Sequence, residues 1–248
     1  MNPYSSLCDD FYVNLNLSTE MELPQSRETV LHYLERIQKQ YPTMRNFFSR
    51  EKGEFVLEED KEGGGQCRWT SVENRRLCSG VFNPETVDVA MEQHRLVLEM
   101  APVYLSMSTL DCETLDLLYV FDFNYRGNQN KLVAEALGAS PAVERLFEVP
   151  GAKMLNFEPS FKFALDEDCR TQCSLSVETR NTLYQIRTGD FPEDQISVYF
   201  TARHLGSLEP GTSFLDELEK LSKICREMVE SHVIDNVLRP LAQAIAIK

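Results

Sequence analysis

Two short stretches of the chain place a hydroxyl, a carboxylate and a guanidinium at the same spacing. One reads SVENR and starts at Ser71, and the other reads SVETR and starts at Ser176. Side chains of a strand alternate between its two faces, so the serine, glutamate and arginine of each stretch are expected on one face. Such a face can bind a polar partner. The sequence therefore predicts a binding site made of four residues: Glu73, Arg75, Glu178 and Arg180.

The alternative explanation is an ordinary solvated sheet. Antiparallel sheets often turn one face to water, and exposed Glu–Arg pairs contribute only about 0.2–1 kcal/mol. The two stretches belong to a longer repeated phrase, because FVLEED at 55–60 precedes the first and FALDED at 163–168 precedes the second. Each phrase predicts a strand, an acidic turn and a second strand.

The repeated phrase offers metal ligands but no metal site. A calcium loop needs acidic or amide residues at alternate positions and a glycine at a fixed place, and neither acidic turn has that order. Zinc needs about four ligands, and Cys169 and Cys173 form an isolated pair. Cys67 and Cys173 each follow a glutamine in the phrase, which predicts equivalent packing positions for them. We expect no metal.

No catalytic residue or cofactor is predicted from the sequence. His32, His94 and His232 fall on predicted helices beside apolar stripes, and His204 follows a strand where exposure is expected. Nucleophile–base pairs are assembled in space, so spacing along the chain does not locate one. The glycine-rich GGGQC at 63–67 lacks the Lys-Ser/Thr of a phosphate-binding loop. The sequence leans towards a non-enzymatic protein and leaves enzyme activity open.

The net charge is −14, from 25 Lys and Arg against 39 Asp and Glu. Lys and Arg supply most nucleic-acid affinity by displacing counterions, so this balance argues against a nucleic-acid or membrane partner. Seven irregularly spaced cysteines do not form a secreted disulfide framework. The first residues lack a signal peptide, and no apolar run reaches the roughly 20 residues of a membrane span. We expect a cytoplasmic protein.

Hydrophobic periodicity predicts the elements of the first half. Residues 10–18 alternate apolar and polar side chains, as in a half-buried strand. A helix follows Ser26, and its buried stripe contains Val30, Tyr33, Leu34 and Ile37. Four short strands come next, joined by hairpin turns, with Lys52–Gly53 as one turn signal. Asn83–Pro84 then predicts the start of a second helix, with Asn83 as its N-cap.

The second half predicts a similar order. Residues 114–125 form an apolar strand, and two short helices follow, the second from Ser140–Pro141. Strands are expected at about 152–165, 171–179, 182–188 and 195–203. A long amphipathic helix over 213–238 closes the chain. The similar order of elements predicts an internal duplication, with halves at 1–105 and 106–248 and an extra strand in the second half.

The duplicated order β-α-β4-α, with the twin FVLEED/FALDED phrases, resembles the TATA-box-binding protein fold over about 10–232. The resemblance is one of topology, and no motif of that family is present. It implies an α+β protein with one curved antiparallel sheet and helices on one side. The family's fold carries DNA-contacting phenylalanines and basic residues on the concave face. The acidic composition of this chain does not match that use.

A helix-grip domain is the alternative architecture, because 114–232 can also form a sheet around one long C-terminal helix. That fold implies a carrier of a small apolar ligand. The duplicated phrase favours the first architecture. The leading hypothesis is a binding or scaffold protein that engages a protein or peptide partner. The carrier is second and an enzyme with a site assembled in space is third. The sequence does not predict the oligomeric state.

Overall fold

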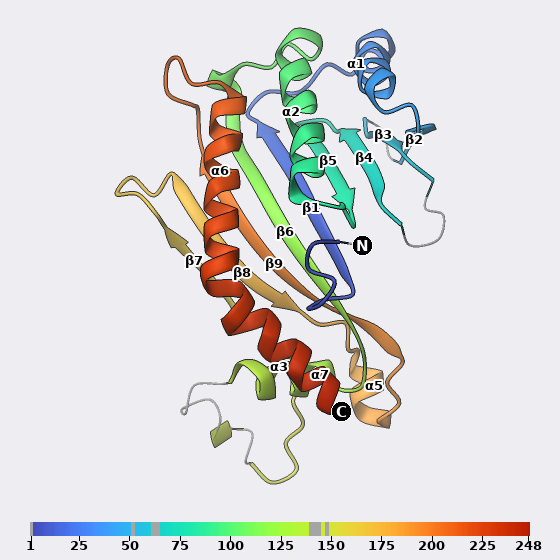
Figure 1. Ribbon diagram of the computed structural model, residues 1–248, viewed down its shortest axis with the longest axis vertical. Coiled ribbons are helices and arrows are strands. Elements are labelled where there is room, and N and C mark those ends of the chain that lie inside the picture. The colour runs from blue at the N-terminus through green and yellow to red at the C-terminus, as the bar shows by residue number, and fades with distance from the viewer. Residues whose placement is uncertain (1, 51–52, 61–64, 139–144, 147–148) are drawn as a thin grey trace.

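The computed structural model describes residues 2–50, 53–60, 65–138, 145–146 and 149–248 (Figure 1). This part of the chain is an α+β protein with one antiparallel sheet of nine strands, in the order β2-β3-β4-β5-β1-β6-β9-β8-β7. The strands are β1 (Asp10–Thr19), β2 (Asn46–Ser49), β3 (Phe55–Glu58), β4 (Cys67–Val72), β5 (Arg76–Phe82), β6 (Cys112–Arg126), β7 (Ser160–Ala164), β8 (Thr171–Glu178) and β9 (Glu193–Leu205).

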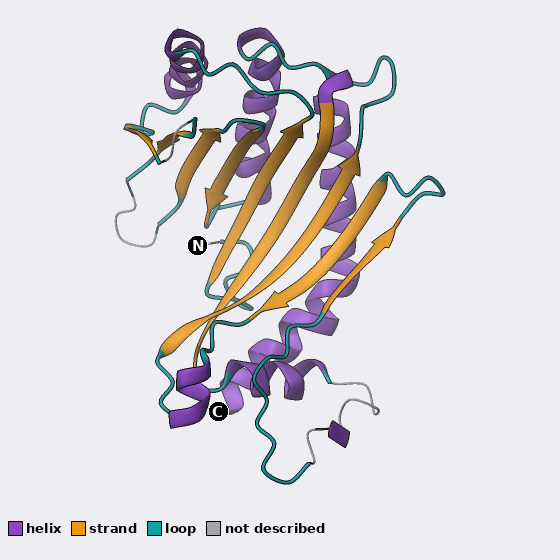
Figure 2. Ribbon diagram, turned by 180° about the vertical axis from the view of Figure 1, so that it is seen from behind, coloured by secondary structure: helices purple, strands orange, loops and turns teal. Residues whose placement is uncertain are grey.

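Helices lie on one face of this sheet and beyond its lower end (Figure 1). They are α1 (Arg27–Gln40), α2 (Val87–Tyr104), the 3₁₀ turn η1 (Thr109–Asp111), α3 (Gln129–Leu137), α5 (Leu183–Thr188), α6 (Phe214–Met228), the π-helical η2 (Val229–Leu238) and α7 (Arg239–Ile247). In Figure 1, α1, α2 and α6 lie in front of the strands. Figure 2, seen from behind, shows the strands in full view with those helices beyond them. We call this uncovered side the open face.

The core lies between the sheet and the helices. The strand period predicted for 10–18 is confirmed, because Phe11, Val13, Leu15 and Leu17 of β1 are completely buried while the residues between them are half-buried. From α6, an apolar stripe that includes Leu218, Leu221 and Cys225 is likewise completely buried. The alternation therefore fixes which side chains of each strand reach the open face.

Capping explains where the first helices begin. Ser26 caps α1 as predicted, since its hydroxyl accepts a hydrogen bond from the Thr29 amide. The predicted cap Asn83 is wrong: Thr86 caps α2 through the Val89 amide. Asn83 instead has a positive φ, and its side chain accepts from the Phe11 amide at 2.9 Å. Asparagine tolerates this left-handed backbone, so Asn83 turns the chain before the helix starts.

The strand predicted at 182–188 is also wrong, because these residues form helix α5. Thr182 and Gln185 make a reciprocal capping box at its start, and Gly189 ends it in a left-handed conformation. The local signals at both ends were therefore those of a helix. The strand predicted at 152–165 is shorter than expected and covers only 160–164.

The strand at 195–203, predicted as the extra strand of the second half, is present as β9. In the described part of the chain, β1 is flanked by four strands on one side, whereas β6 is flanked by three on the other. The outermost position beside β7 holds no described strand. The predicted helix from Ser140–Pro141, the Lys52 turn position and Gly63–Gly64 lie outside the described residues.

Cys67 and Cys173 do not occupy equivalent positions. Cys173 lies directly opposite Ala202 of β9, which pairs with Leu117 on the helix-covered face. Cys67 lies opposite Phe82, which pairs with Tyr12 on the open face. A shift of one residue moves a side chain to the other face of a strand, so the shared QC letters do not predict a shared environment.

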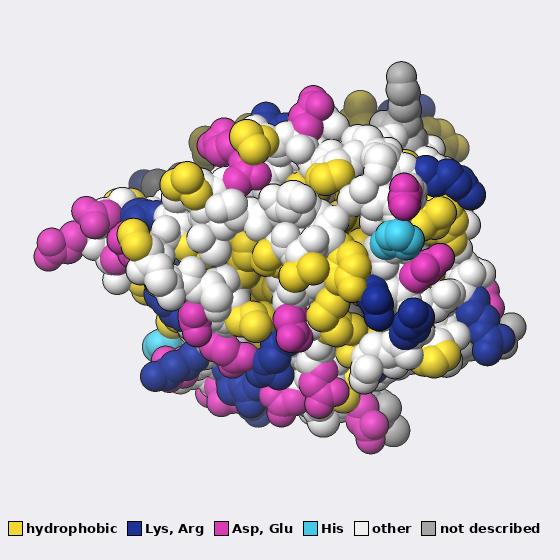
Figure 3. Space-filling model, turned by 90° about the horizontal axis from the view of Figure 1, so that it is seen from above, with side chains coloured by type: hydrophobic (Ala, Val, Ile, Leu, Met, Phe, Trp, Pro, Cys, Tyr) yellow, Lys and Arg dark blue, Asp and Glu magenta, His cyan; other side chains and the backbone are white. Residues whose placement is uncertain are grey.

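Among the described residues, no helix is both long and apolar enough to cross a membrane. Figure 3 looks onto the upper end of the molecule, where acidic and basic side chains lie next to each other at several places around a central group of hydrophobic ones. On this end the acidic excess is mixed with basic side chains and forms no continuous acidic surface.

Candidate functional site

The structure separates Glu73 from Arg75. Strand β4 ends at Val72, so both residues lie in the turn before β5 and the predicted alternation no longer applies. Arg75 donates from Nε to the carbonyl of Thr19 at 3.0 Å, whereas Glu73 pairs with Arg76 at 2.7 Å. Arg75 thereby ties the turn to the end of β1. Glu73 and Arg75, the first predicted pair, therefore lie in a turn and are not part of the exposed sheet face.

Glu178 and Arg180 are brought together at the end of β8. Arg180 Nη1 lies 3.2 Å from Glu178 Oε2, and its Nη2 donates to Ser197 Oγ at 3.1 Å and lies 3.5 Å from the Tyr199 hydroxyl. The Arg180 amide donates to Oε1 of Gln129, a buried residue at the start of α3. Because α3 holds the backbone, the guanidinium is directed onto the open face.

A row of side chains crosses this part of the open face. Strand pairing places its members directly opposite one another, and at its centre Tyr12 and Phe82 have ring centroids 4.9 Å apart. Aromatic rings so placed contribute large apolar area in a fixed geometry. We call it the middle row: Cys67, Phe82, Tyr12, Val120, Tyr199, Ser176 and Ser160.

A second row lies beside the first and crosses all nine strands. Its only large aromatic is Trp69, which faces Gly80 across the β4–β5 pair. A Cβ built on Gly80 would lie 2.2 Å from Trp69 Nε1, so the indole lies against the sheet where only glycine fits. We call it the long row: Asn46, Glu58, Trp69, Gly80, Asn14, Leu118, Thr201, Ser174 and Lys162.

Asp122 is a buried carboxylate beside the middle row. Only 4% of the residue is exposed, and its Oδ1 has no hydrogen-bond partner among the described residues. Burial raises the pKa of Asp122 above its ordinary value, and hydrogen bonds with Ser197 and Tyr12 oppose that rise only in part. An unpaired buried acceptor costs free energy unless a partner supplies a donor.

On the side of the two rows away from Asp122, the open face carries an ion pair between Arg203 and Asp116. Arg203 binds Asp116 through two nitrogens, with Nε 2.6 Å from Oδ1, and Asp116 is largely buried. A two-point arginine–carboxylate pair is rigid and neutral overall. The middle row from Phe82 to Tyr199 is therefore apolar and aromatic, with polar groups on either side of it.

The histidine expected at the surface is buried. His204 Nδ1 lies 3.2 Å from a carboxylate oxygen of Glu217 on α6, and each residue is 5% exposed. Burial opposes ionisation, but His204 and Lys220 lower the pKa of Glu217 below its ordinary value. The pair ties α6 to β9, and neither residue lines a described hollow.

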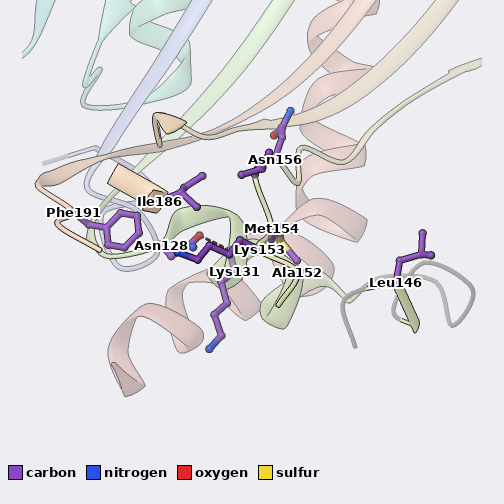
Figure 4. A pocket seen from close by; sticks show the side chains of 10 residues that line it. Asn128, Lys131, Leu146, Ala152, Lys153, Met154, Asn156, Ile186 and Phe191 are labelled. Atoms are coloured by element: carbon purple, nitrogen blue, oxygen red, sulfur yellow. Dashed lines mark hydrogen bonds between the residues drawn. The ribbon is translucent and has the colours of Figure 1, made fainter. Parts of the chain in front are cut away.

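A separate hollow of about 760 Å³ lies at the lower end of the molecule. Figure 4 shows its wall, built from the start of α3, the loop at 152–156, α5 and Phe191. Lys131 and Lys153 contribute amino groups there, and none of its lining residues is acidic. Its lining shares no residue with the middle row.

Sequence reasoning missed most of this open-face site. Tyr12 stands at a polar position of the alternating 10–18 segment, and that signal was sufficient to place it on the exposed side. Tyr199 carried the same signal, because Ser197 and Thr201 alternate with apolar residues around it, whereas RLCSGVF around Phe82 does not alternate clearly. In the described residues, no group of three His, Cys, Asp or Glu side chains could hold a metal ion.

Comparisons with known proteins give no family for this chain. No family model matches it, and no curated protein matches it. A solved structure titled "alkyldihydroxyacetonephosphate synthase in P1" aligns with 96% of this chain and 43% of its own, at 11% identity and a TM-score of 0.14. A similarity this weak supports neither a fold nor a function.

Proposed function

We propose that this protein is a binding or scaffold protein whose open face engages a protein or peptide partner. The observation that carries the proposal is the middle row, which sets Phe82, Tyr12, Val120 and Tyr199 side by side on the uncovered side of the sheet. Trp69 of the long row lies next to them. Protein interfaces are enriched in aromatic residues and arginine at their centres, with a polar rim around them.

Arg180 is the candidate anchor at the rim of this surface. Its guanidinium is oriented by Glu178, Ser197 and Tyr199, so little side-chain freedom is lost when a partner binds it. The Asp122 carboxylate lies buried beside it. Of the four residues predicted from the sequence, the proposed site keeps Glu178 and Arg180. The aromatic side chains of the middle row are added to them.

An internal duplication of the TATA-box-binding-protein type is part of the proposal for the fold. In support, β1 and β6 are adjacent at the centre, and the last strand of each half, β5 or β9, pairs with the first. DNA binding is not proposed, because the middle row contains no Lys or Arg to neutralise phosphates. A carrier of a small apolar ligand is less supported, since the apolar stripe of α6 packs directly into the core.

The proposal is tested by panning the intact protein against a library of random peptides displayed on phage. We expect peptides whose affinity falls at least about tenfold in the variants Trp69→Ala and Tyr199→Ala, since central aromatic residues dominate binding energy. Trp69 is the only tryptophan in the chain, so its fluorescence reports binding directly.

The matched control is Tyr184→Ala, because Tyr184 is an aromatic side chain 63% exposed on α5, outside the two rows. It should leave affinity unchanged. Peptides that bind the Trp69→Ala and Tyr199→Ala variants as tightly as the natural protein, or a failure to enrich any peptide, would contradict the proposal.

A further inference from the structure

Strand β7 lies at the edge of the sheet, and no described strand pairs with its outer side. The Leu165 amide donates to the Thr171 carbonyl at 2.8 Å, and the Val177 amide donates to the Pro159 carbonyl at 3.0 Å. Antiparallel pairs alternate, so the odd-numbered residues of β7 bond to β8. The N–H and C=O groups of Ser160, Lys162 and Ala164 therefore point away from the sheet.

Apolar side chains flank this edge on the helix-covered side. Phe161 is 56% exposed and Leu165 is 47% exposed, and the half-buried Phe163 lies between them. The Phe161 and Phe163 rings stack with centroids 6.2 Å apart. Natural proteins usually shield such an edge with charge, a bulge or a covering element. Here Lys162 is the single charge in β7, and it makes no ion pair with any described residue.

The same sheet shows what occupies the opposite edge position. Beside β3, the third strand out from β1, strand β2 pairs through Asn46, Phe47, Phe48 and Ser49. The Phe47 ring lies almost parallel to Phe55, with centroids 6.4 Å apart. Strand β7 is the third strand out from β6, and no described strand lies beyond it. Strand β2, an extended segment with Phe47 on the helix side, therefore covers the outer side of β3. No described segment covers the outer side of β7.

We propose that the free edge of β7 binds an extended segment of a partner protein as a tenth, antiparallel strand. The segment places apolar residues opposite Phe161 and Phe163, on the helix side, and an acidic residue opposite Lys162. Main-chain hydrogen bonds supply the affinity in such strand addition, and alternate side chains supply the specificity. The acidic residue pairs with a lysine that has no other ion partner among the described residues.

A second copy of this chain fits the edge less well. The antiparallel register that pairs all five residues of two β7 strands sets Lys162 opposite Lys162 of the copy. Like charges directly opposite each other destabilise a strand pair. The charge therefore favours a partner with a carboxylate at that position.

The test measures fluorescence anisotropy of a labelled peptide that alternates valine with threonine and has one central glutamate. It should bind the intact natural protein, and Lys162→Pro should weaken it at least about tenfold, because one outward N–H donor and the charge are both lost. Proline at this position leaves the ladder with β8 intact, since the Lys162 amide points outward. Lys162→Gln is the matched control, and we expect it to weaken binding only about twofold to fivefold.

A peptide N-methylated on the amides that face β7 keeps its side chains but should not bind, which tests the main-chain contacts even if Lys162→Pro fails to fold. The proposal does not depend on the aromatic side chains of the open face, and Tyr184→Ala, a variant on α5 outside both surfaces, should bind the peptide normally. Absence of binding, equal binding of the N-methylated peptide, or a concentration-dependent dimer in light scattering that Lys162→Pro abolishes would each overturn it.

Discussion

At the scale of single residues, the open face is defined by a few side chains whose environment is unusual. Trp69 lies over a glycine, and Asp122 is a carboxylate buried beside aromatic rings. Neither arrangement maximises stability, because glycine weakens a strand and a buried charge costs free energy. Functional surfaces commonly retain such costs. Both features can be tested one residue at a time.

Gly80→Ala should displace the indole of Trp69. The new Cβ would lie 2.2 Å from Trp69 Nε1 and 2.5 Å from Asn14 Oδ1, so the ring must move into solvent. We expect a red shift of tryptophan emission and a loss of about 1–3 kcal/mol in the free energy of unfolding. Gly65→Ala is the control, because nothing lies within 4 Å of its added Cβ. An unchanged emission spectrum for Gly80→Ala would show that Trp69 does not lie against the sheet.

Asp122→Asn should stabilise the protein at neutral pH. The folded pKa of Asp122 is raised because burial disfavours its charged form, so the carboxylate destabilises the native state above that pKa. We expect a gain of up to about 1 kcal/mol at pH 7. The advantage should shrink as pH falls through the folded pKa, because the natural side chain then takes up a proton. Urea unfolding at several pH values measures this, and a variant less stable at pH 7 would refute it.

At the scale of elements, packing rather than surface charge holds the helices on the sheet. Leu221 of α6 is completely buried. The link from α2 to α6 also includes Arg95 and Glu219, 2.6 Å apart, but their side chains are 41% and 53% exposed. Exposed pairs of this kind are screened by water and salt. The two kinds of contact should therefore differ strongly in their contribution to stability.

Leu221→Ala should cost about 2–5 kcal/mol, since it removes buried methyl groups and leaves a cavity under α6. Arg95→Ala should cost less than about 1 kcal/mol, because its ion pair is solvated. Chemical denaturation of both variants gives the comparison. Similar losses for the two would mean that the interface between α2 and α6 depends on the ion pair more than its exposure indicates.

At the scale of the whole molecule, one sheet carries both of the surfaces that we propose for partners. Its open face is wide, aromatic at the centre and bordered by the Arg203–Asp116 and Arg180–Glu178 pairs. Its β7 edge is narrow and offers main-chain groups and one lysine. The net charge of −14 describes neither surface, because charged side chains are distributed unevenly over the folded chain. A scaffold that holds one partner on the face and another at the edge agrees with both proposals.

The sequence by itself determined the class of the fold and much of its local structure. The alternation of 10–18, the Ser26 cap and the apolar stripe of 213–238 are short-range patterns, and all three correspond to the observed β1, α1 and α6. Other short-range patterns were not used in the prediction. Thr182, Gln185 and Gly189 carry helix signals, although a strand was predicted at 182–188.

Only the tertiary structure decided the site. Strand order and register set which residues of distant strands lie opposite one another, and both depend on contacts between residues far apart in the chain. The sequence could not show that Cys67 and Cys173 lie on opposite faces, that Arg75 turns back to Thr19, or that Tyr12, Phe82 and Tyr199 share one row. It placed Glu178 and Arg180 on one strand end, and the fold supplied the aromatic neighbours that make them a candidate site.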